Sequence, residues 1–180
     1  ETMDNQISFY FAYGSNMCKT RLLERKVEYV SRSLAYLQGH QLEFTLPHKK
    51  LRNMEFIKDD HLIGYANVSK VSETTSNVID QFCKSSVVYG ILIELKTKEE
   101  IYKLDFFEGI EFGHYTRERV QVQRIKEGRE ETVEALIYFA GRNLLKNGLK
   151  PSKKYMNYLL GGSDLLPTDY VDNLKQLETH

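Results

Sequence analysis

The chain has 180 residues, of which 41% are hydrophobic and 28% charged, and its 25 Lys and Arg balance its 25 Asp and Glu. This length favours a single domain over residues 1–180, and the charge balance gives no reason to expect nucleic acid or a membrane surface as a partner. No apolar run approaches the ~20 residues of a membrane helix. Residues Glu1 to Asp4 lack the pattern of a secretory signal, and two cysteines, Cys18 and Cys83, fit a reducing compartment. We therefore expect a cytoplasmic protein.

The first predicted element is a strand over 7–12, where the side chains of "ISFYFA" alternate between two faces. It ends at the turn 13–16, and a helix is predicted over 17–25. Further strands are expected at 33–37, 41–46, 62–68, 86–95, 115–124 and 132–139. Further helices are expected at 97–108, 152–160 and 168–178. Strands with dispersed helices predict an α+β fold, a curled mixed sheet or small mixed β-barrel with flanking helices.

Two local features qualify this outline. Thr97 followed by Glu100 predicts a capping box at the start of the helix over 97–108. The stretch 69–86 is polar, serine-rich and long for a connection between two strands. Long connections of this kind are either lids over a binding site or surface excursions, and both readings remain open.

The turn "YGSN" at 13–16 is the first candidate site. Gly14 permits close approach of another group, while Ser15 and Asn16 are typical N-cap residues for the helix that follows. Backbone amides from Gly14 to Met17 would then point outward at a helix start, a geometry that holds anions. A plain strand-to-helix connection is the alternative.

Glu108 is the second candidate. On the predicted helix over 97–108 it shares the apolar face of Ile101 and Leu104, at the last turn before Gly109. Burial and the helix C-terminus both disfavour a negative charge, so the pKa of Glu108 should be raised, as a general base near neutral pH requires. Alternatively, Glu108 turns to solvent at a frayed helix end or bonds to Tyr115 or an arginine.

Tyrosines and histidines complete the survey. Tyr10, Tyr13, Tyr115 and Tyr138, among twelve tyrosines, either line a polar pocket or belong to the core and rim. The five histidines show no metal-ligand spacing, so no metal is expected. A serine nucleophile at position 15 would need a histidine base, for which only His114 is a candidate.

Several stretches together, in order and spacing, resemble the γ-glutamylcyclotransferase family. They are "FYFAYGSNM", "GYANV" at 64–68, "VVYGILIEL", "KLDFFEGIEFGHYTR", "ALIYFAG" and the closing "PSKKYMNYLLGGSDLLPTDYVDNL". The similarity covers most of the chain. The YGSN turn alone is only a moderately specific sign of this family. The same turn followed by a strand with V-x-G and then by Glu-Gly is a much more specific sign.

The resemblance implies a small mixed barrel and a cyclisation linked to glutathione metabolism. The α-amino group of a γ-glutamyl amino acid attacks its own γ-carbonyl, which releases an amino acid and leaves 5-oxoproline. Glu108 matches the catalytic base of the family. The implied substrate-binding residues are Tyr10, Phe11, Ala12, Tyr13, Gly14, Ser15 and Asn16 in the loop, with Tyr115 and Tyr138.

The resemblance also implies that no cofactor is needed, because the substrate supplies its own nucleophile. Asn16 indicates the branch that acts on γ-glutamyl amino acids rather than the branches specific for glutathione or γ-glutamylamines. The stretch 69–86 departs from the family pattern and leaves the leaving group open. Three alternatives remain: a related cyclotransferase with another leaving group, a non-catalytic binding module for a γ-glutamyl-like or carboxylate ligand, and a serine hydrolase. A homodimer is compatible with the sequence, although no stretch reads as an interface.

Overall fold

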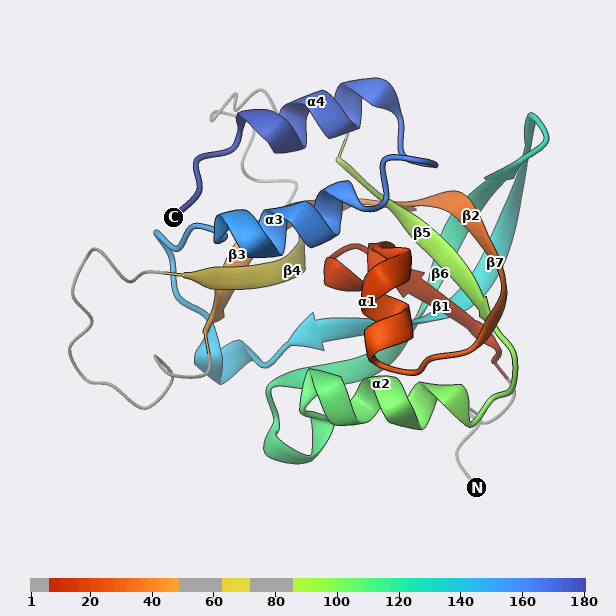
Figure 1. Ribbon diagram of the computed structural model, residues 1–180, viewed down its shortest axis with the longest axis horizontal. Helices are drawn as coiled ribbons and strands as arrows, with labels where there is room; N and C mark the ends of the chain where they lie inside the picture. Colours follow the sequence, from red (N-terminus) through yellow and green to blue (C-terminus); the bar gives the residue numbers. More distant parts are fainter. Residues whose placement is uncertain (1–6, 49–62, 72–85) are drawn as a thin grey trace.

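A closed barrel of five strands forms the centre of the protein, described by a computed structural model over residues 7–48, 63–71 and 86–180. The strand order is β1-β5-β2-β6-β7, and the neighbours pair antiparallel except β1 and β7. These two pair in parallel, with Tyr10 opposite Leu136, and so close the barrel (Figure 1). The barrel strands are β1 (Phe9–Ala12), β2 (Tyr29–Gln38), β5 (Val87–Leu95), β6 (Tyr115–Lys126) and β7 (Arg129–Ala140).

The remaining elements surround this barrel. Strands β3 (His40–Pro47) and β4 (Gly64–Lys70) form a separate antiparallel pair. In the view of Figure 1, α3 and α4 lie together on one side, α2 lies on the opposite side and α1 lies between them. The helices are α1 (Lys19–Glu24), α2 (Glu100–Glu108), α3 (Lys153–Leu160) and α4 (Thr168–Gln176), with 3-10 turns η2 (Ser15–Met17), η6 (Ile110–Phe112) and η7 (Arg142–Leu144).

The core has two parts because successive strand residues point to opposite faces. One cluster contains Phe11 of β1 with buried apolar residues of the other four barrel strands and of β4, so it fills the barrel interior beneath the β3–β4 pair. The other contains Tyr10 and Ala12 together with Leu104 of α2, Leu159 of α3 and residues of α1 and α4. The helices therefore cover the outer face of the barrel, and β1 is buried on both faces.

The fold class predicted from the sequence, a small α+β barrel with flanking helices, is confirmed. Each predicted strand and helix is present, with ends that shift by a few residues. Residues 72–85, most of the predicted long connection, lie outside the described part of the chain. Within that part, no helix combines the length and the apolar character needed to cross a membrane.

The predicted capping box is wrong. Helix α2 begins at Glu100, and its N-cap is Glu99, whose side chain caps nothing. The Glu100 carboxylate instead accepts hydrogen bonds from the Glu28 amide at 2.9 Å and from Lys103 Nζ at 2.8 Å. Glu100 thus ties α2 to the start of β2, and a tertiary contact replaces the local cap.

Candidate active site

A pocket of about 380 Å³ lies where β1 ends and helices α1, α2 and α3 approach the barrel. Eight of the ten predicted site residues line it: Tyr10, Tyr13, Gly14, Ser15, Asn16, Glu108, Tyr115 and Tyr138. The lining also includes Arg21, Glu24, Arg25, Tyr65, Ala66, Phe107, His114 and Tyr155. Charged groups and tyrosine hydroxyls thus share the lining with aromatic rings, which suits a ligand with polar groups.

The loop after β1 folds into the 3-10 turn η2 rather than directly into an α-helix. Its Met17 amide donates to the Gly14 carbonyl at 3.1 Å, so this amide is not available to a ligand. Within the described residues, the amides of Gly14, Ser15 and Asn16 donate to no backbone carbonyl. Three amides therefore remain at the pocket wall, one fewer than the sequence predicted.

The predicted capping roles of Ser15 and Asn16 are wrong, because neither side chain caps η2 or α1. The Asn16 side chain, almost fully buried, turns into the pocket. Its Nδ2 donates to Tyr10 Oη at 3.0 Å and to Glu108 Oε1 at 3.1 Å, while its Oδ1 accepts from Arg25 Nη1 at 2.8 Å. Asn16 thus links β1, α1 and α2 at the pocket.

Glu108 is the last residue of α2, and Gly109 ends the helix in the left-handed conformation, with φ of 64°. Its carboxylate does not face open solvent, since the side chain is only 15% exposed, but it does bond to an arginine, as one of the alternatives from the sequence expected. Oε1 accepts from Arg25 Nη1 at 3.2 Å as well as from Asn16. Burial raises the pKa of Glu108, although the adjacent Arg25 and the hydrogen bond from Asn16 oppose this rise.

All hydrogen bonds that the described residues make to Glu108 fall on Oε1. The second oxygen, Oε2, therefore keeps its lone pairs for a ligand in the pocket. A carboxylate that is fixed through one oxygen and open at the other has the geometry of a general base.

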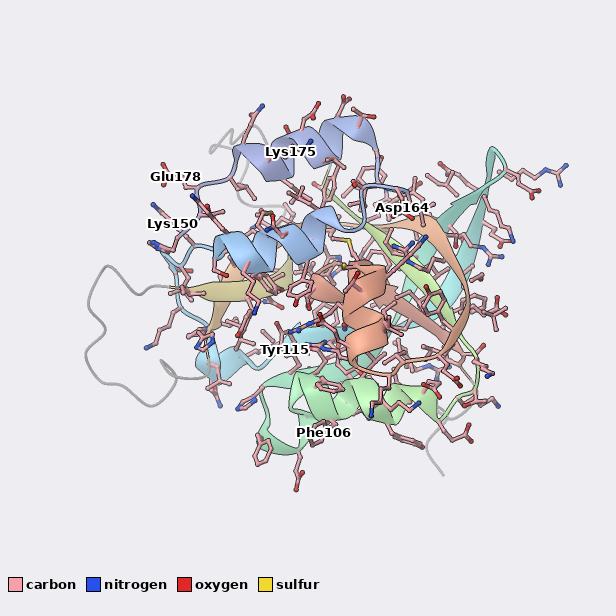
Figure 2. All side chains as sticks on the ribbon, in the orientation of Figure 1. Phe106, Tyr115, Lys150, Asp164, Lys175 and Glu178 are labelled. Carbon is pink, nitrogen blue, oxygen red and sulfur yellow. The ribbon has the colours of Figure 1, made fainter. Side chains whose placement is uncertain are left out.

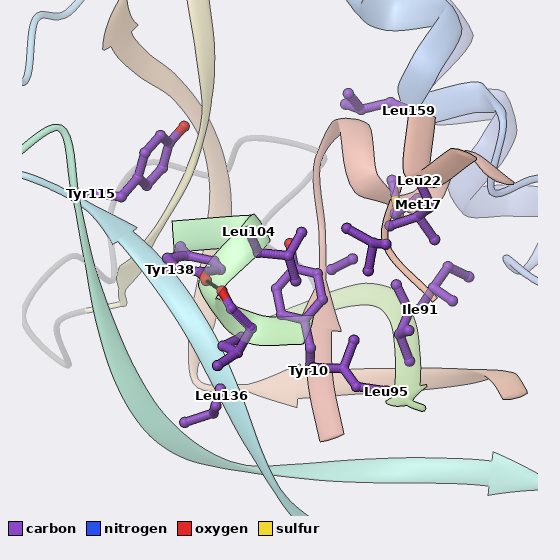
Figure 3. Packing of buried hydrophobic residues seen from close by; sticks show 14 of the residues in the cluster. Tyr10, Met17, Leu22, Ile91, Leu95, Leu104, Tyr115, Leu136, Tyr138 and Leu159 are labelled. Atoms are coloured by element: carbon purple, nitrogen blue, oxygen red, sulfur yellow. Dashed lines mark hydrogen bonds between the residues drawn. The ribbon is translucent and has the colours of Figure 1, made fainter. Parts of the chain in front are cut away.

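Tyr10, Tyr13 and Tyr138 build the wall behind Glu108. The rings of Tyr10 and Tyr138 meet edge to face with centroids 5.6 Å apart, and Tyr13 Oη donates to the Tyr138 carbonyl. Figure 3 shows Tyr10 of β1 and Tyr138 of β7 beside Leu104 of α2. Burial raises the pKa of all three hydroxyls above the ordinary tyrosine value, so they stay protonated at neutral pH.

Tyr115 lies apart from this group, at the start of β6 (Figure 3). Its hydroxyl donates to the Ala66 carbonyl of β4 at 2.8 Å, which anchors the separate strand pair to the barrel beside the pocket. The predicted Phe11 and Ala12 do not line the pocket. Phe11 points into the barrel interior and Ala12 packs beneath the helices, as the alternation of β1 requires.

The serine-nucleophile alternative gains no support from the geometry. Ser15 is buried and lines the pocket, and its hydroxyl makes no side-chain hydrogen bond among the described residues that would activate it as a nucleophile. Across the described ranges 7–48, 63–71 and 86–180, no three His, Cys, Asp or Glu side chains are grouped as metal ligands. Cys18 is a partly buried free thiol, and Cys83 lies outside these ranges.

Sequence reasoning missed two residues that the structure places at the centre of the site, Arg25 and Tyr155. Arg25 lies on α1 one turn after Arg21, a spacing that puts two arginines on one helix face directly after the loop. This signal was present in the sequence. Tyr155 comes from α3, far along the chain, and no local pattern connects it to the loop.

The Tyr155 hydroxyl lies directly over the loop. It accepts from the Ala66 amide at 3.1 Å, and a Cβ added to Gly14 would come within 3.0 Å of it. Gly14 is therefore needed for close approach, as the sequence predicted. Burial raises the pKa of Tyr155, so its proton remains in place. Within the described residues its O–H donates to no acceptor, which leaves this proton for a ligand.

Comparisons with known proteins identify relatives in sequence and in fold. The model of the AIG2-like family matches residues 87–174. A γ-glutamylcyclotransferase from Bos taurus is 27% identical over 98% of this chain and 82% of its own length. Among solved structures, an uncharacterized human protein has a TM-score of 0.70 at 24% identity, and a γ-glutamyl cyclotransferase has a TM-score of 0.68 at 21% identity. Both alignments cover 96% of this chain and 88% of the other.

The family resemblance seen in the motifs is thus confirmed by alignment over nearly the whole chain and by the fold. The chain is similar in sequence to a γ-glutamylcyclotransferase, and it has the γ-glutamylcyclotransferase fold.

Proposed function

We propose that this protein is a γ-glutamylcyclotransferase that converts γ-glutamyl amino acids into 5-oxoproline and a free amino acid. The observation that carries the proposal is a largely buried carboxylate, Glu108, in the same pocket as the loop amides of Gly14, Ser15 and Asn16, where no other described residue bonds to Oε2 of Glu108 or accepts from these three amides. The relative from Bos taurus carries the name of this activity and aligns over nearly the full chain.

Glu108 acts as the general base in this proposal. The α-amino group of the substrate arrives as an ammonium, which has no lone pair for attack on a carbonyl. Oε2 of Glu108 accepts a proton from it, and the raised pKa of this buried carboxyl brings its basicity closer to that of the amine. Arg25 and Asn16 hold the opposite oxygen, so the base keeps one orientation during the transfer.

The loop would stabilise the charge that develops on the γ-carbonyl oxygen. Attack by the amine produces a tetrahedral oxyanion, which the amides of Gly14, Ser15 and Asn16 can receive. The Tyr155 hydroxyl adds a fourth donor above Gly14, and the bond that it accepts from Ala66 polarises its own O–H. Loss of one oxyanion donor in other enzymes costs about 10²–10³ in rate.

The reaction balances without a further reactant. A bond forms between the α-nitrogen and the γ-carbon, and the bond between that carbon and the leaving nitrogen breaks. The α-ammonium loses two protons as it becomes the ring N–H, while the leaving amide nitrogen gains two and departs as an ammonium. Glu108 relays protons between the two nitrogens and ends the cycle ionised.

The test is incubation of the protein with γ-glutamyl-alanine and quantification of 5-oxoproline and alanine. We expect the two products in equal amounts, with formation abolished in Glu108→Gln. Binding of the dipeptide without conversion would contradict the proposal and favour the binding module considered from the sequence.

A further inference from the structure

Exposed aromatic side chains gather around the end of α2, next to Glu108. Phe106 is 78% exposed, Phe112 is 73% exposed and Phe107 is 37% exposed. Figure 2 shows Phe106 on α2 at the outer edge of the molecule. Single exposed apolar residues are ordinary on protein surfaces, but three exposed phenylalanines within seven positions of one another, all beside the pocket, suggest a role in binding.

Two ring pairs connect this feature to the pocket. Phe106 meets Phe107 edge to face at 5.4 Å, and Phe107 lines the pocket. Phe112 lies against the His114 ring at 5.7 Å, and His114 also lines the pocket. Each pair therefore has one ring inside the pocket and one phenylalanine in solvent outside it. We call these four residues, Phe106, Phe107, Phe112 and His114, the aromatic rim.

The rim flanks the reacting position from both sides. Phe107 immediately precedes Glu108, and the His114 ring packs on Gly109, where an added Cβ would meet His114 Nδ1 at 2.4 Å. Phe107 also lies beneath the Arg25 guanidinium, whose carbon is 4.9 Å from the ring centroid, and Arg25 holds Glu108. A group attached to the γ-carbonyl of a substrate held at Glu108 thus has aromatic surface within reach.

The pocket interior and the rim differ in chemistry. The interior presents the Glu108 carboxylate, loop amides and tyrosine hydroxyls, which match the charged γ-glutamyl head common to all substrates of the proposed reaction. The rim presents apolar ring faces and matches a hydrophobic side chain. Since the head group occupies the polar interior, the variable leaving amino acid is the part of the substrate left to contact the rim.

We propose that the aromatic rim is the leaving-group subsite and selects γ-glutamyl amino acids whose leaving residue is aromatic or large and aliphatic. This inference rests on the proposed function. Contact with the rim removes apolar surface of the leaving side chain from water, and specificity of this kind amounts to roughly 10-fold or more in kcat/KM.

The test compares 5-oxoproline release from γ-glutamyl-phenylalanine, γ-glutamyl-leucine and γ-glutamyl-alanine. We expect kcat/KM for the phenylalanine dipeptide to exceed that for the alanine dipeptide by roughly 10-fold, with leucine between them. An equal or higher value for γ-glutamyl-alanine overturns the inference while the proposed function stands, and it would leave the rim as a surface for another molecule.

Substitutions of the rim phenylalanines test whether the rim causes the preference for an aromatic leaving group. Phe112→Ala and Phe107→Ala should each bring the phenylalanine-to-alanine ratio of kcat/KM towards one, whereas Phe107→Leu should retain an intermediate ratio. Leu23→Ala is the matched control, because Leu23 is 78% exposed on α1 but does not line the pocket. Its ratio should equal that of the unaltered protein. A ratio that is unchanged in both phenylalanine-to-alanine variants would overturn the inference.

Failure of the proposed function is distinguishable from failure of the rim. If none of the three dipeptides yields 5-oxoproline, the proposed function fails. Calorimetric Kd values for the same dipeptides then test the rim independently of turnover. Tighter binding of γ-glutamyl-phenylalanine than of γ-glutamyl-alanine supports the subsite, and equal Kd values overturn it.

Discussion

Helix α2 carries two buried carboxylates one turn apart, and they are used differently. Asp105 pairs with Arg117 of β6 through Oδ2 and accepts from Tyr138 Oη at 2.7 Å through Oδ1. Glu108 pairs with Arg25 and accepts from Asn16, but both bonds fall on Oε1. The side chains are similarly buried, 19% exposed for Asp105 and 15% for Glu108.

Burial and an arginine partner therefore do not separate a structural carboxylate from a candidate catalytic one. The difference lies in how many oxygens the protein already occupies. Both oxygens of Asp105 are engaged, so it fastens α2 to β6 and β7. Glu108 lines the pocket, and within the described residues only its Oε1 accepts hydrogen bonds, so of the two carboxylates it is the one that can exchange a proton with a ligand without breaking a contact.

The largest expected effect comes from neutralising each carboxylate in turn. Glu108→Gln should lower turnover by about 10²–10⁴-fold, the usual contribution of a general base, with little change in Tm because Gln Oε1 still accepts from Arg25 and Asn16. Asp105→Asn should instead destabilise the fold by about 2 kcal/mol, since it removes the charge from the Asp105–Arg117 ion pair that joins α2 to β6. Product assays and thermal unfolding of both variants check this, and an active Glu108→Gln variant would remove Glu108 as the base.

Arg25 and Arg117, the arginine partners of the two carboxylates, should also differ in their effect on catalysis. Arg25→Gln should lower kcat by roughly 10- to 10²-fold through loss of alignment, and Arg25→Lys should recover part of it. The positive charge of Arg25 lowers the pKa of Glu108, so its removal should shift the acid limb of the kcat/KM profile to higher pH. Arg117→Gln should leave this limb in place. If Arg25→Gln also left it in place, Arg25 would have no electrostatic role at Glu108.

A smaller contrast is expected for the hydroxyl groups next to the two carboxylates. Tyr138→Phe removes a hydrogen bond donated to Asp105 and should lower the free energy of unfolding by about 2 kcal/mol. Tyr10→Phe removes the acceptor of one Asn16 N–H, while the other N–H still donates to Glu108, and should cost about 1 kcal/mol because only a neutral hydrogen bond is lost. Denaturant unfolding of the two variants gives both values, and equal losses would contradict this difference.

The smallest effect is the pH dependence of stability at the two ends of α2. Burial raises the folded-state pKa of Glu108, so ionisation works against folding, and the Tm of Glu108→Gln relative to the unaltered protein should rise with pH. Burial also favours the neutral form of Glu100, but bonds from Lys103 and the Glu28 amide outweigh it and lower the pKa. Glu100→Gln should therefore lose Tm relative to the unaltered protein as pH rises through the unfolded value. Thermal unfolding between acid and neutral pH gives the Tm of both variants and of the unaltered protein. If Tm changed with pH equally in all three proteins, these directions would be contradicted.

Much of this arrangement could be predicted from the sequence. The alternation in β1, the Gly-containing turn and the apolar face of α2 are local patterns, and each led to the correct element and to residues that line the pocket. The raised pKa of Glu108 followed from its place on that face. Helix-capping rules failed where a side chain could either cap a helix or bond to a distant residue. Ser15, Asn16 and Glu100 were all predicted to take part in caps, and none of them does.

The residues that were missed depend on packing between distant elements. Tyr155 reaches the loop because the end of α3 approaches it closely: a Cβ on Gly161 would lie 2.6 Å from Cys18 Sγ. Nothing near Tyr155 in the sequence encodes this approach. The bonding of Glu108 through only one oxygen could not be predicted from the sequence either. It depends on how Arg25 and Asn16 are placed when β1, α1 and α2 pack together.

The parallel closure between β1 and β7 has a consequence for biosynthesis. Strand β1 emerges first from the ribosome, yet its partners β5 and β7 follow much later in the chain. Until β7 has been translated, β1 has an unpaired edge and apolar residues on both faces. Exposed strands of this kind pair with other chains and promote aggregation. The glycine turn at its end can therefore take its final shape only after β7 has been translated. Premature stops before β7 should yield aggregates rather than a partly active protein.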